Sequence, residues 1–320
     1  MASLTTSTSA VAFAALLRLK GIGRRAALRI VDSPMPEIDA QQYLLQRTRG
    51  AKLSEDDVIA AWHKAEDDLG CSADHGIKAL SIHDEGYPER LKNIPDPPVI
   101  LYVKGDVAGL KSERSLAVIG TREPTPYGEK VAKRSAASAV EEGYVIVSGL
   151  AHGCDTLAHE GCLDQMGIGI AVMAHGLDKV YPAANRGLAA RLLDAGGCLV
   201  SEYPLGMTPM RTAFAERDRI QSGLSDAVLV IETDVKGGTM HTVRFSRDQK
   251  RALACIKHPD IWRHEDKTRG NQMLIADRWA EAIPDGEALL SFLRKLCVQG
   301  SVRSEEPCPT IPKTQMCLDF

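Results

Sequence analysis

Two copies of one pattern, both within residues 116–159, constrain the fold more than any other feature of the sequence. Each copy consists of a short apolar run, a glycine turn and a segment with helical character. The first run, residues 116–119, ends at Gly120, and the second, residues 144–147, is followed closely by Gly149. Continuous apolar strands that alternate with helices are typical of a parallel sheet covered on both faces. Ligands of such sheets bind at the carboxyl ends of the strands, where both glycine turns lie.

The helix boundaries in this pattern are marked by residues with strong positional preferences. Pro126 falls in the first turn of the first expected helix, and Gly143 lies just beyond its end. The second helix is expected to begin after Gly153, with Asp155 as its cap. The sequence therefore predicts strand, turn, helix, strand, turn and helix in succession.

Each glycine turn has the chemistry of a phosphate site. Glycine allows a positive φ and close approach of a ligand to the backbone, and the N-terminus of the following helix favours anions. Arg122 can add a charge-assisted contact, whereas His152 is expected to pack within its turn rather than to act as a base. The candidate binding residues of the two turns are Gly120, Thr121, Arg122, Gly149, His152 and Gly153. Neither turn has the G-x-G-x-x-G or G-x-x-x-x-G-K-[ST] spacing, so no dinucleotide, ATP or other cofactor is expected.

The overall composition excludes several classes of protein. A net charge of −3 means that any binding of nucleic acid must come from a local basic patch. The eight cysteines form no C-x-x-C pair, so we expect reduced thiols, no metal site and a cytoplasmic location. The apolar stretch at residues 10–17 is too short to span a membrane, and no basic segment precedes it, so neither a membrane anchor nor a secretory signal is expected.

Residues 1–75 are expected to form a small helical domain. Two short helices flank the Lys20-Gly21-Ile22-Gly23 turn, which resembles the helix-hairpin-helix family, a SAM-like arrangement in which a glycine-rich turn contacts DNA phosphates. The alternative is a plain turn between two helices in a packing domain. A further helix is predicted over residues 54–69, with Ser54 as its cap.

Beyond the central pattern, the chain carries a series of short motifs in a fixed order. They are D-E-G-Y-P-E-R-L at 84–91, P-P-x-x-L-Y-x-K-G at 97–105, A-V-I-G-T-R at 117–122, V-S-G-L-A-H-G-C-D at 147–155, Y-P-A-A-N-R at 181–186, S-E-Y-P-L-G at 201–206 and L-S-D-A-V-L-V-I-E at 224–232. Together they resemble the motifs of the DNA-processing protein A (DprA/Smf) family over residues 10–257. Within the second motif, residues 99–103 are predicted to form an extra strand beside the main sheet.

The resemblance implies a Rossmann-like, doubly wound and mostly parallel sheet that binds single-stranded DNA, behind the N-terminal helical domain. It further implies a recombination mediator that forms a homodimer, helps to load a RecA-type recombinase during DNA uptake and catalyses no reaction of its own. We place the Rossmann-like domain at residues 76–260, a C-terminal helical extension at 261–298 and a flexible tail at 299–320. Many family members carry a C-terminal winged-helix domain, which we do not expect in a chain of this length.

Carrying the family's DNA pocket over residue by residue adds further candidates to Arg122. Arg211 and Phe214 match a basic and an aromatic residue of that pocket, and Phe214 could stack on a base. Arg217 and Arg219 match two arginines of an F-P-x-R-N-R pattern and would pair with successive phosphates. Alternatively, Phe214 belongs to the core, and the arginines pair with acidic residues of the same region. These acidic residues are Glu216, Asp218 and Asp226.

Several departures from the family pattern mark a divergent member. Asp218 replaces the usual Asn and would place a negative charge in the expected path of the DNA, while Ala215 replaces a Pro. The turn Lys236, Gly237, Gly238 and Thr239 replaces the usual S-G-S-L, and as a Gly-Gly turn before a helix it is again a phosphate seat.

The same turn loosely resembles the P-G-G-x-G-T loop of the lysine-decarboxylase-like (LOG) nucleotide phosphoribohydrolases, but the catalytic Glu of that family is missing. The alternative function is therefore a nucleotide-binding sensor or a nucleotide N-glycosidic hydrolase that uses the same cleft.

After His258 the sheet is expected to end, and residues 277–297 are predicted to be helical with a break at 284–286. Residues 299–313 have the composition of a linker. The last six residues resemble the Q-x-x-L-x-F peptide that docks on the polymerase sliding clamp, with Gln315, Leu318 and Phe320 as its contacts. Alternatively, this tail packs on its own domain.

Overall fold

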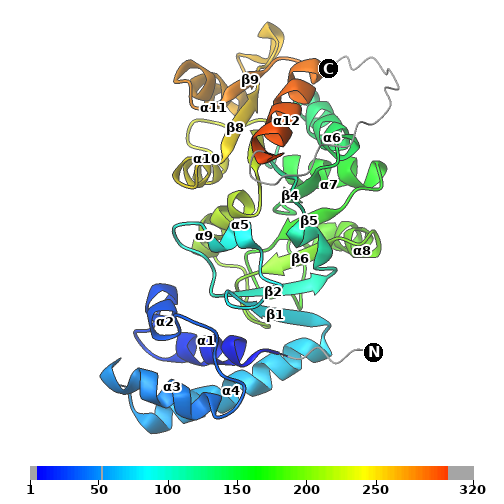
Figure 1. Cartoon of the computed structure of the whole chain (residues 1–320). Helices are drawn as coiled ribbons and strands as arrows, with labels where there is room; N and C mark the ends of the chain where they lie inside the picture. Colours follow the sequence, from blue (N-terminus) through cyan, green and yellow to red (C-terminus); the bar gives the residue numbers. More distant parts are fainter. Residues whose placement is uncertain (1–5, 52, 302–320) are drawn as a thin grey trace.

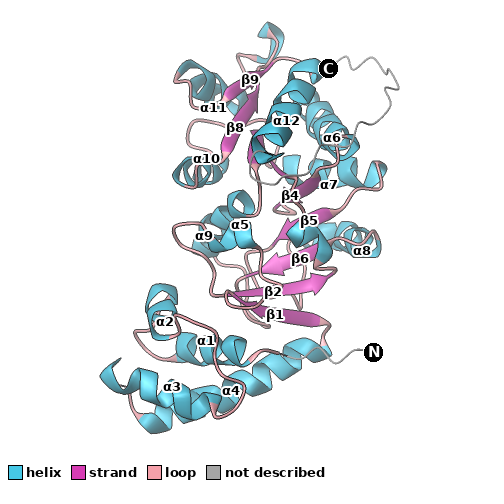
Figure 2. Ribbon diagram, viewed as in Figure 1, coloured by secondary structure: helices cyan, strands magenta, loops and turns pink. Residues whose placement is uncertain are grey.

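The computed structural model of the chain describes residues 6–51 and 53–301. Within these ranges a nine-stranded sheet has the order β1-β2-β6-β5-β4-β3-β7-β8-β9. Its strands are β1 (Ile77–Ser81), β2 (Ile100–Gly105), β3 (Ser115–Ile119), β4 (Val145–Ser148), β5 (Gly169–Val172), β6 (Cys198–Ser201), β7 (Ala227–Val230), β8 (Ala252–Ile256) and β9 (Glu281–Ile283). Only the pairs β1·β2 and β2·β6 are antiparallel. The prediction of a mostly parallel α/β sheet is confirmed (Figure 2).

Four helices precede the first strand of the sheet in the chain, and the other described helices alternate with the strands (Figure 1). They are α1 (Thr8–Arg18), α2 (Arg24–Ile30), α3 (Ala40–Thr48), α4 (Glu55–Asp74), α5 (Glu89–Lys92), α6 (Pro126–Glu141), α7 (Cys154–Asp164), α8 (Arg186–Asp194), α9 (Arg211–Gly223), α10 (Thr239–Asp248), α11 (Asp266–Ala276) and α12 (Gly286–Ser301). Short 3-10 turns occur at η1 (Arg49–Ala51), η2 (Ala108–Lys111), η3 (Ala183–Asn185) and η4 (Asp260–Trp262).

The pattern at residues 116–159 folds as its sequence indicates. All residues of β3 and β4 are buried, and the two strands pair in parallel with Leu116 opposite Ile146. Helix α6 begins at Pro126, and Gly143 beyond its end has a φ of 82°. The cap of α7 differs from the prediction, because Gly153 occupies the N-cap position and Asp155 lies inside the first turn.

The chain reverses its winding direction between β3 and β7. From β3 the parallel strands proceed to β4, β5 and β6 on one side, whereas β7 lies on the other side of β3 and leads to β8 and β9. At this switch point the backbone N–H of Thr121 donates to the carbonyl of Glu232 over 2.8 Å. Open α/β sheets bind ligands outside the carboxyl ends of the strands at such a position.

Of the N-terminal helices, α1 and α4 pack against the antiparallel edge of the sheet, and α2 and α3 pack on these two helices. Phe13, Leu16 and Leu44 are fully buried and belong to one hydrophobic core with β1 and β2. The 20–23 turn joins α1 to α2 as expected, and Gly21 has a φ of 86° that disfavours any residue with a Cβ. The boundary expected at residue 75 falls directly after α4. Because the helices and the sheet share one hydrophobic core, the division into two domains at this residue stays a prediction.

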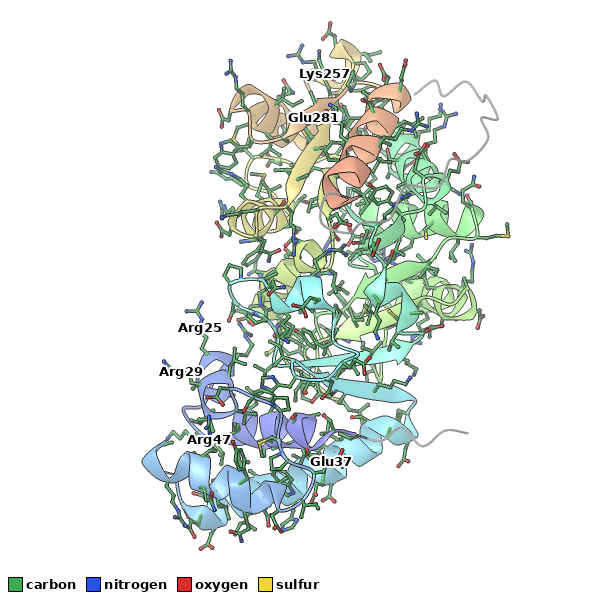
Figure 3. The ribbon with its side chains drawn as sticks, in the orientation of Figure 1. Arg25, Arg29, Glu37, Arg47, Lys257 and Glu281 are labelled. Carbon is green, nitrogen blue, oxygen red and sulfur yellow. The ribbon has the colours of Figure 1, made fainter. Side chains whose placement is uncertain are left out.

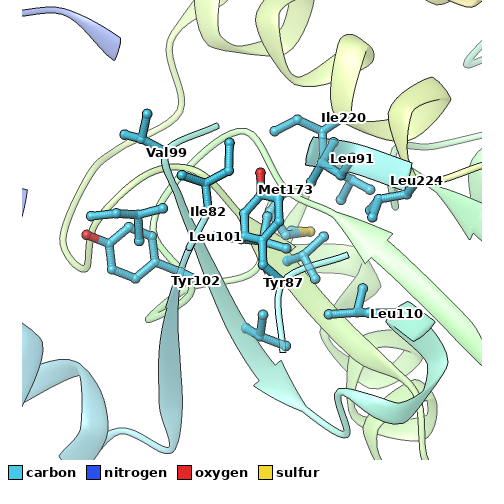
Figure 4. Close-up of a cluster of buried hydrophobic side chains, with 14 of the residues drawn as sticks. Ile82, Tyr87, Leu91, Val99, Leu101, Tyr102, Leu110, Met173, Ile220 and Leu224 are labelled. Atoms are coloured by element: carbon cyan, nitrogen blue, oxygen red, sulfur yellow. The ribbon is translucent and has the colours of Figure 1, made fainter. Parts of the chain in front are cut away.

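The D-E-G-Y-P-E-R-L motif supports the core rather than a ligand site. Tyr87 is 5% exposed, and its hydroxyl donates to the carbonyl of Pro98 over 2.6 Å. Around it pack Leu91, Leu101 and Met173 (Figure 4). Arg90 forms an ion pair with Asp226 at 2.7 Å. The motif therefore fixes the starts of β2, β3 and β7.

The C-terminal part of the sheet differs from the prediction. The sheet does not end after His258, because β9 adds a parallel strand beside β8, within the segment 277–297 that was expected to be helical. Helix α11 lies within the helical extension expected at 261–298, although it precedes the segment 277–297, and α12 continues through Ser301 into the expected linker. A three-residue strand is too short to show an alternating pattern. Gln315, Leu318 and Phe320 lie outside the described residues.

Candidate nucleic-acid interface

Two glycine turns lie side by side at the carboxyl edge of the sheet. The N–H of Cys154, the first residue of α7, donates to the carbonyl of Thr121 over 3.1 Å. Gly153 has a φ of 75°, and a Cβ there would lie 2.5 Å from the carbonyl carbon and oxygen of Arg122. Only glycine permits this approach, so the loop after β4 is fixed against the loop after β3.

Arg122 and Phe214 meet above these turns. The guanidinium carbon of Arg122 lies 5.6 Å from the centroid of the Phe214 ring, within the range of a cation–π contact. Phe214 lies in the first turn of α9 and is partly buried, while Arg122 is exposed. The ring of Tyr181, which is 47% exposed, lies 5.8 Å from that of Phe214. The structure thus combines one cation and two accessible aromatic rings on a single surface.

The remaining candidates at this edge divide into exposed and supporting residues. Arg211 begins α9 and is exposed, and His152 is also exposed, so the expectation that His152 packs within its turn is wrong. Lys236 and Gly238 are exposed after β7, and Thr239 begins α10. Their common feature is accessibility to an anion. Because β7 is adjacent to β3, the 236–239 turn and Arg122 belong to the same stretch of the edge.

Arg217 does not lie in the path of a ligand. Its side chain is 6% exposed, Nη1 donates to the carbonyl of Val172 over 2.6 Å, and Nε lies 3.2 Å from Oδ1 of Asp218. A Cβ on Gly149 would lie 1.9 Å from Nη1 of Arg217, so the guanidinium packs directly against the turn after β4. The expectation that Arg217 contacts a phosphate is therefore wrong. Its buried guanidinium instead supports the turn at Gly149 from inside the protein.

Arg219 is likewise an internal residue. Its guanidinium forms two hydrogen bonds of 2.6 Å with the carboxylate of Glu202, and its Nε donates to the carbonyl of Asp96 over 2.8 Å. Only 2% of the residue is exposed. Although acidic partners were the alternative for both arginines, Glu202 was not among those considered. The acids that pair with Arg219 come from other loops of the chain.

Asp218 faces Arg217 rather than solvent, so its charge does not lie in the expected DNA path. Its side chain is 13% exposed. Burial, opposed by Arg217 and reinforced by the neighbouring Asp155, raises the pKa of Asp218 to about 7. Burial also raises the pKa of Asp155, against the attraction of Arg217. Oδ2 of Asp155 accepts the N–H groups of Gly149 and Ala151 over 3.1 and 3.3 Å. This cluster of two carboxyl groups and one arginine holds the second glycine turn.

A second buried cluster, which the sequence did not indicate, fixes the switch point. The carboxylate of Glu232 is fully buried and accepts the N–H and the hydroxyl of Thr125 over 2.8 and 2.6 Å. Nε2 of His258 lies 3.2 Å from Oε1 of Glu232. Thr125 also caps α6, since its hydroxyl accepts the N–H of Gly128. The start of α6 is therefore tied to the end of β7.

Asn271 on α11 connects the ends of β7 and β8. Its Nδ2 donates to the carbonyls of Ile231 and Ile256 over 2.8 and 3.0 Å, and its Oδ1 accepts the N–H of Thr233 over 3.0 Å. The preceding Gly270 donates its N–H to the carbonyl of Thr233. These bonds shape the loop that leads to Lys236. The only sequence signal for them was the Gly-Asn pair itself.

Within residues 6–51 and 53–301, no group of His, Cys, Asp and Glu side chains is arranged to hold a metal ion. In the same ranges no helix combines the length and the apolar character needed to cross a membrane.

An α/β protein with this edge is a candidate nucleic-acid-binding protein. The model of the family DNA recombination-mediator protein A matches residues 78–294, and the chain belongs to this family. DNA processing protein DprA of Bacillus subtilis is 33% identical over 231 residues, which is 72% of this chain and 76% of that protein. Protein Smf of Synechocystis is 39% identical over 186 residues, but this match covers only 46% of that protein.

Two solved structures agree with this assignment. DNA processing protein A of Streptococcus pneumoniae superposes with a TM-score of 0.67 at 27% identity, over 89% of this chain and 94% of that chain. DNA processing protein A of Helicobacter pylori, which has been studied for its single-stranded DNA binding mode, superposes with a TM-score of 0.61 at 28% identity. That match covers 70% of this chain and 96% of the other.

Proposed function

We propose that the chain binds single-stranded DNA at the carboxyl edge of the sheet and acts as a mediator of recombination. The observation that carries this proposal is the surface formed by Arg122, Phe214 and Tyr181 beside two glycine turns. Exposed aromatic rings stack on unpaired bases regardless of sequence, and a nearby arginine contacts phosphate or stacks in turn. A duplex hides its bases within the stack and offers such rings much less, so single strands are the preferred ligand.

Membership of the family supports the other partners that we propose. A mediator would load a RecA-type recombinase on the bound strand, act as a homodimer in the cytoplasm and need no catalytic group. The exposed Arg211, His152 and Lys236 would contact the phosphates on either side of the stacked base, because phosphate contacts position a strand without reading its sequence. Binding of the tail to the sliding clamp remains part of the proposal and can be tested by removing residues 315–320.

Fluorescence anisotropy with a labelled single strand and a duplex tests the function. Arg122→Ala should weaken single-strand binding roughly tenfold, as expected for the loss of one charged hydrogen bond, and should reduce the salt slope by about 0.7. Arg191→Ala is the matched control, because this exposed arginine lies near the end of α8 at the opposite edge of the sheet. Saturable binding of a mononucleotide without binding of single strands would overturn the proposal in favour of a nucleotide sensor or hydrolase.

A further inference from the structure

A groove runs between α2 and the segment 95–97 of the Rossmann-like part. It has a volume of about 460 Å³ and is lined by Arg24, Arg25, Leu28, Arg29, Asp32 and the segment Pro95-Asp96-Pro97. A second hollow, lined by Arg29, Ile22, Ala26 and Arg47 among others, lies on the other side of Arg29. Arg29 on α2 therefore lines both the groove and the second hollow.

The groove is strongly basic for a protein with a net negative charge. Residues 8–31 contain five arginines and lysines and no acidic residue. Arg25 and Arg29 are four residues apart on α2, so they lie on the same face of the helix. Both are exposed and extend away from the rest of the molecule (Figure 3).

The acidic residues that face this groove already have partners in the protein. Oδ1 of Asp32 lies 2.7 Å from Nη2 of Arg47. Oδ2 of Asp96 lies 2.8 Å from Nη2 of Arg24, whereas its Oδ1 lies 3.5 Å from Nε of Arg25. The side chain of Arg25 remains 80% exposed. The charges of Arg25 and Arg29 are therefore the ones that this groove offers to an external anion.

The groove is joined to the proposed DNA site through Arg24. Its guanidinium lies 3.1 Å from the carboxylate of Glu216 and 3.3 Å from that of Glu202. Glu216 is two residues after Phe214 on α9, and Glu202 follows β6 at the carboxyl edge. In Figure 1, α2 and α9 lie on the same side of the molecule. A strand that follows α9 from Phe214 towards the α2 groove would pass Glu216, whose carboxylate is paired with Arg24.

We propose that Arg25 and Arg29 form a second contact for the same DNA strand, in which the groove beside α2 holds the sugar-phosphate backbone after it leaves the Arg122–Phe214 site. The two guanidinium groups bind phosphates, while Leu28, Pro95 and Pro97 provide an apolar wall for the sugars. This extension rests on the proposed function, since it needs a strand already bound at the carboxyl edge. An acidic protein segment is the competing occupant.

The test compares two lengths of oligonucleotide with the full-length protein. A strand of about 6 nucleotides would fill only the Arg122–Phe214 site, whereas one of about 25 would also reach α2. For the long strand, Arg25→Ala/Arg29→Ala should lower affinity at least about threefold and reduce the salt slope by about 1.4, equivalent to two lost phosphate contacts. The short strand should bind as it does to the wild type. Lys111→Ala/Arg191→Ala removes the same charge from the opposite edge and should change neither measurement.

The outcomes separate the two proposals. If the double variant binds both lengths like the wild type while Arg122→Ala weakens both, the groove proposal fails and the proposed function stands. The groove proposal also fails if the double variant weakens both lengths equally, or if it loses only the binding of a protein partner. If the wild type binds neither length, the proposed function fails and the groove proposal fails with it.

Discussion

The guanidinium of Arg122 lies 5.6 Å from the centre of the Phe214 ring, so the loop after β3 and the first turn of α9 share one surface. Arg122 is exposed and forms no ion pair with another described residue. A side chain that is exposed and not neutralised internally remains available to a ligand. By contrast, Arg217 and Arg219, which lie on α9 with Phe214, are buried and pair with acidic residues inside the protein.

Phe214→Leu should weaken single-strand binding without changing its salt dependence. Stacking of a base on an aromatic ring contributes about 1–3 kcal/mol, so the affinity should fall roughly 5- to 150-fold. Leucine keeps most of the apolar volume, and the salt slope should stay constant because no phosphate contact is lost. Fluorescence anisotropy at several salt concentrations measures both quantities.

Phe214→Tyr is the matched control, because it keeps the ring and should bind nearly as well as the wild type. If the leucine variant also binds like the wild type, Phe214 does not stack on a base. A thermal unfolding curve shows separately whether the partly buried ring contributes to stability.

Arg217→Met should destabilise the protein rather than act on DNA directly. The substitution leaves Asp155 and Asp218 buried beside each other without their cation, a situation that typically costs about 3–5 kcal/mol. Urea denaturation measures the change in the free energy of unfolding. Arg122→Ala is the comparison, since an exposed substitution usually changes stability by less than about 0.5 kcal/mol. Unchanged stability with lost DNA binding would instead place Arg217 in contact with the strand.

The sequence predicted the central fold because its signals are local. The apolar runs of β3 and β4, the proline at the start of α6 and the glycine after its end lie within a few residues of what they determine. The meeting of Arg122 with Phe214 followed only from resemblance to the family. Its physical basis is the winding of the sheet, which no short stretch of sequence reveals.

The errors have physical reasons of the same kind. Arg219 looks like a surface residue in a polar helix, but its partners Glu202 and Asp96 come from other loops. Arg217 pairs with the adjacent Asp218 and packs against the turn after β4. Strand β9 has three residues and exists only because β8 offers it an edge. Charge on a helix therefore predicts exposure poorly where a distant acid is available.

Asn271→Ala should destabilise the loop between β7 and α10. The substitution removes donors from the carbonyls of Ile231 and Ile256 and an acceptor from the N–H of Thr233, all of them buried. Each buried backbone group that is left without a partner costs about 1–3 kcal/mol of stability. We expect lower stability in urea and faster amide exchange at Thr233. Gln272→Ala, the neighbouring substitution on α11, is the control. Equal stability of the two variants would contradict the role assigned to Asn271.

Asp218→Asn should stabilise the protein at high pH and have little effect at low pH. Burial, with Arg217 opposing it and Asp155 adding to it, raises the pKa of Asp218 to about 7 from an ordinary value of 3.8. The folded state therefore binds the proton more tightly than the unfolded state, so this carboxyl group makes stability fall as the pH rises from about 4 to about 7.

Asparagine does not titrate, so the stability of the variant should not fall between pH 4 and pH 7 on account of this residue. Above pH 7 its free energy of unfolding should exceed that of the wild type by about 0.5–3 kcal/mol, the usual range for one buried substitution. Below pH 4 the neutral carboxyl and the amide should be nearly equivalent. Urea denaturation at pH 4 and pH 8 measures the difference. A constant difference between the two proteins at both pH values would mean that Asp218 keeps its ordinary pKa through the pairing with Arg217.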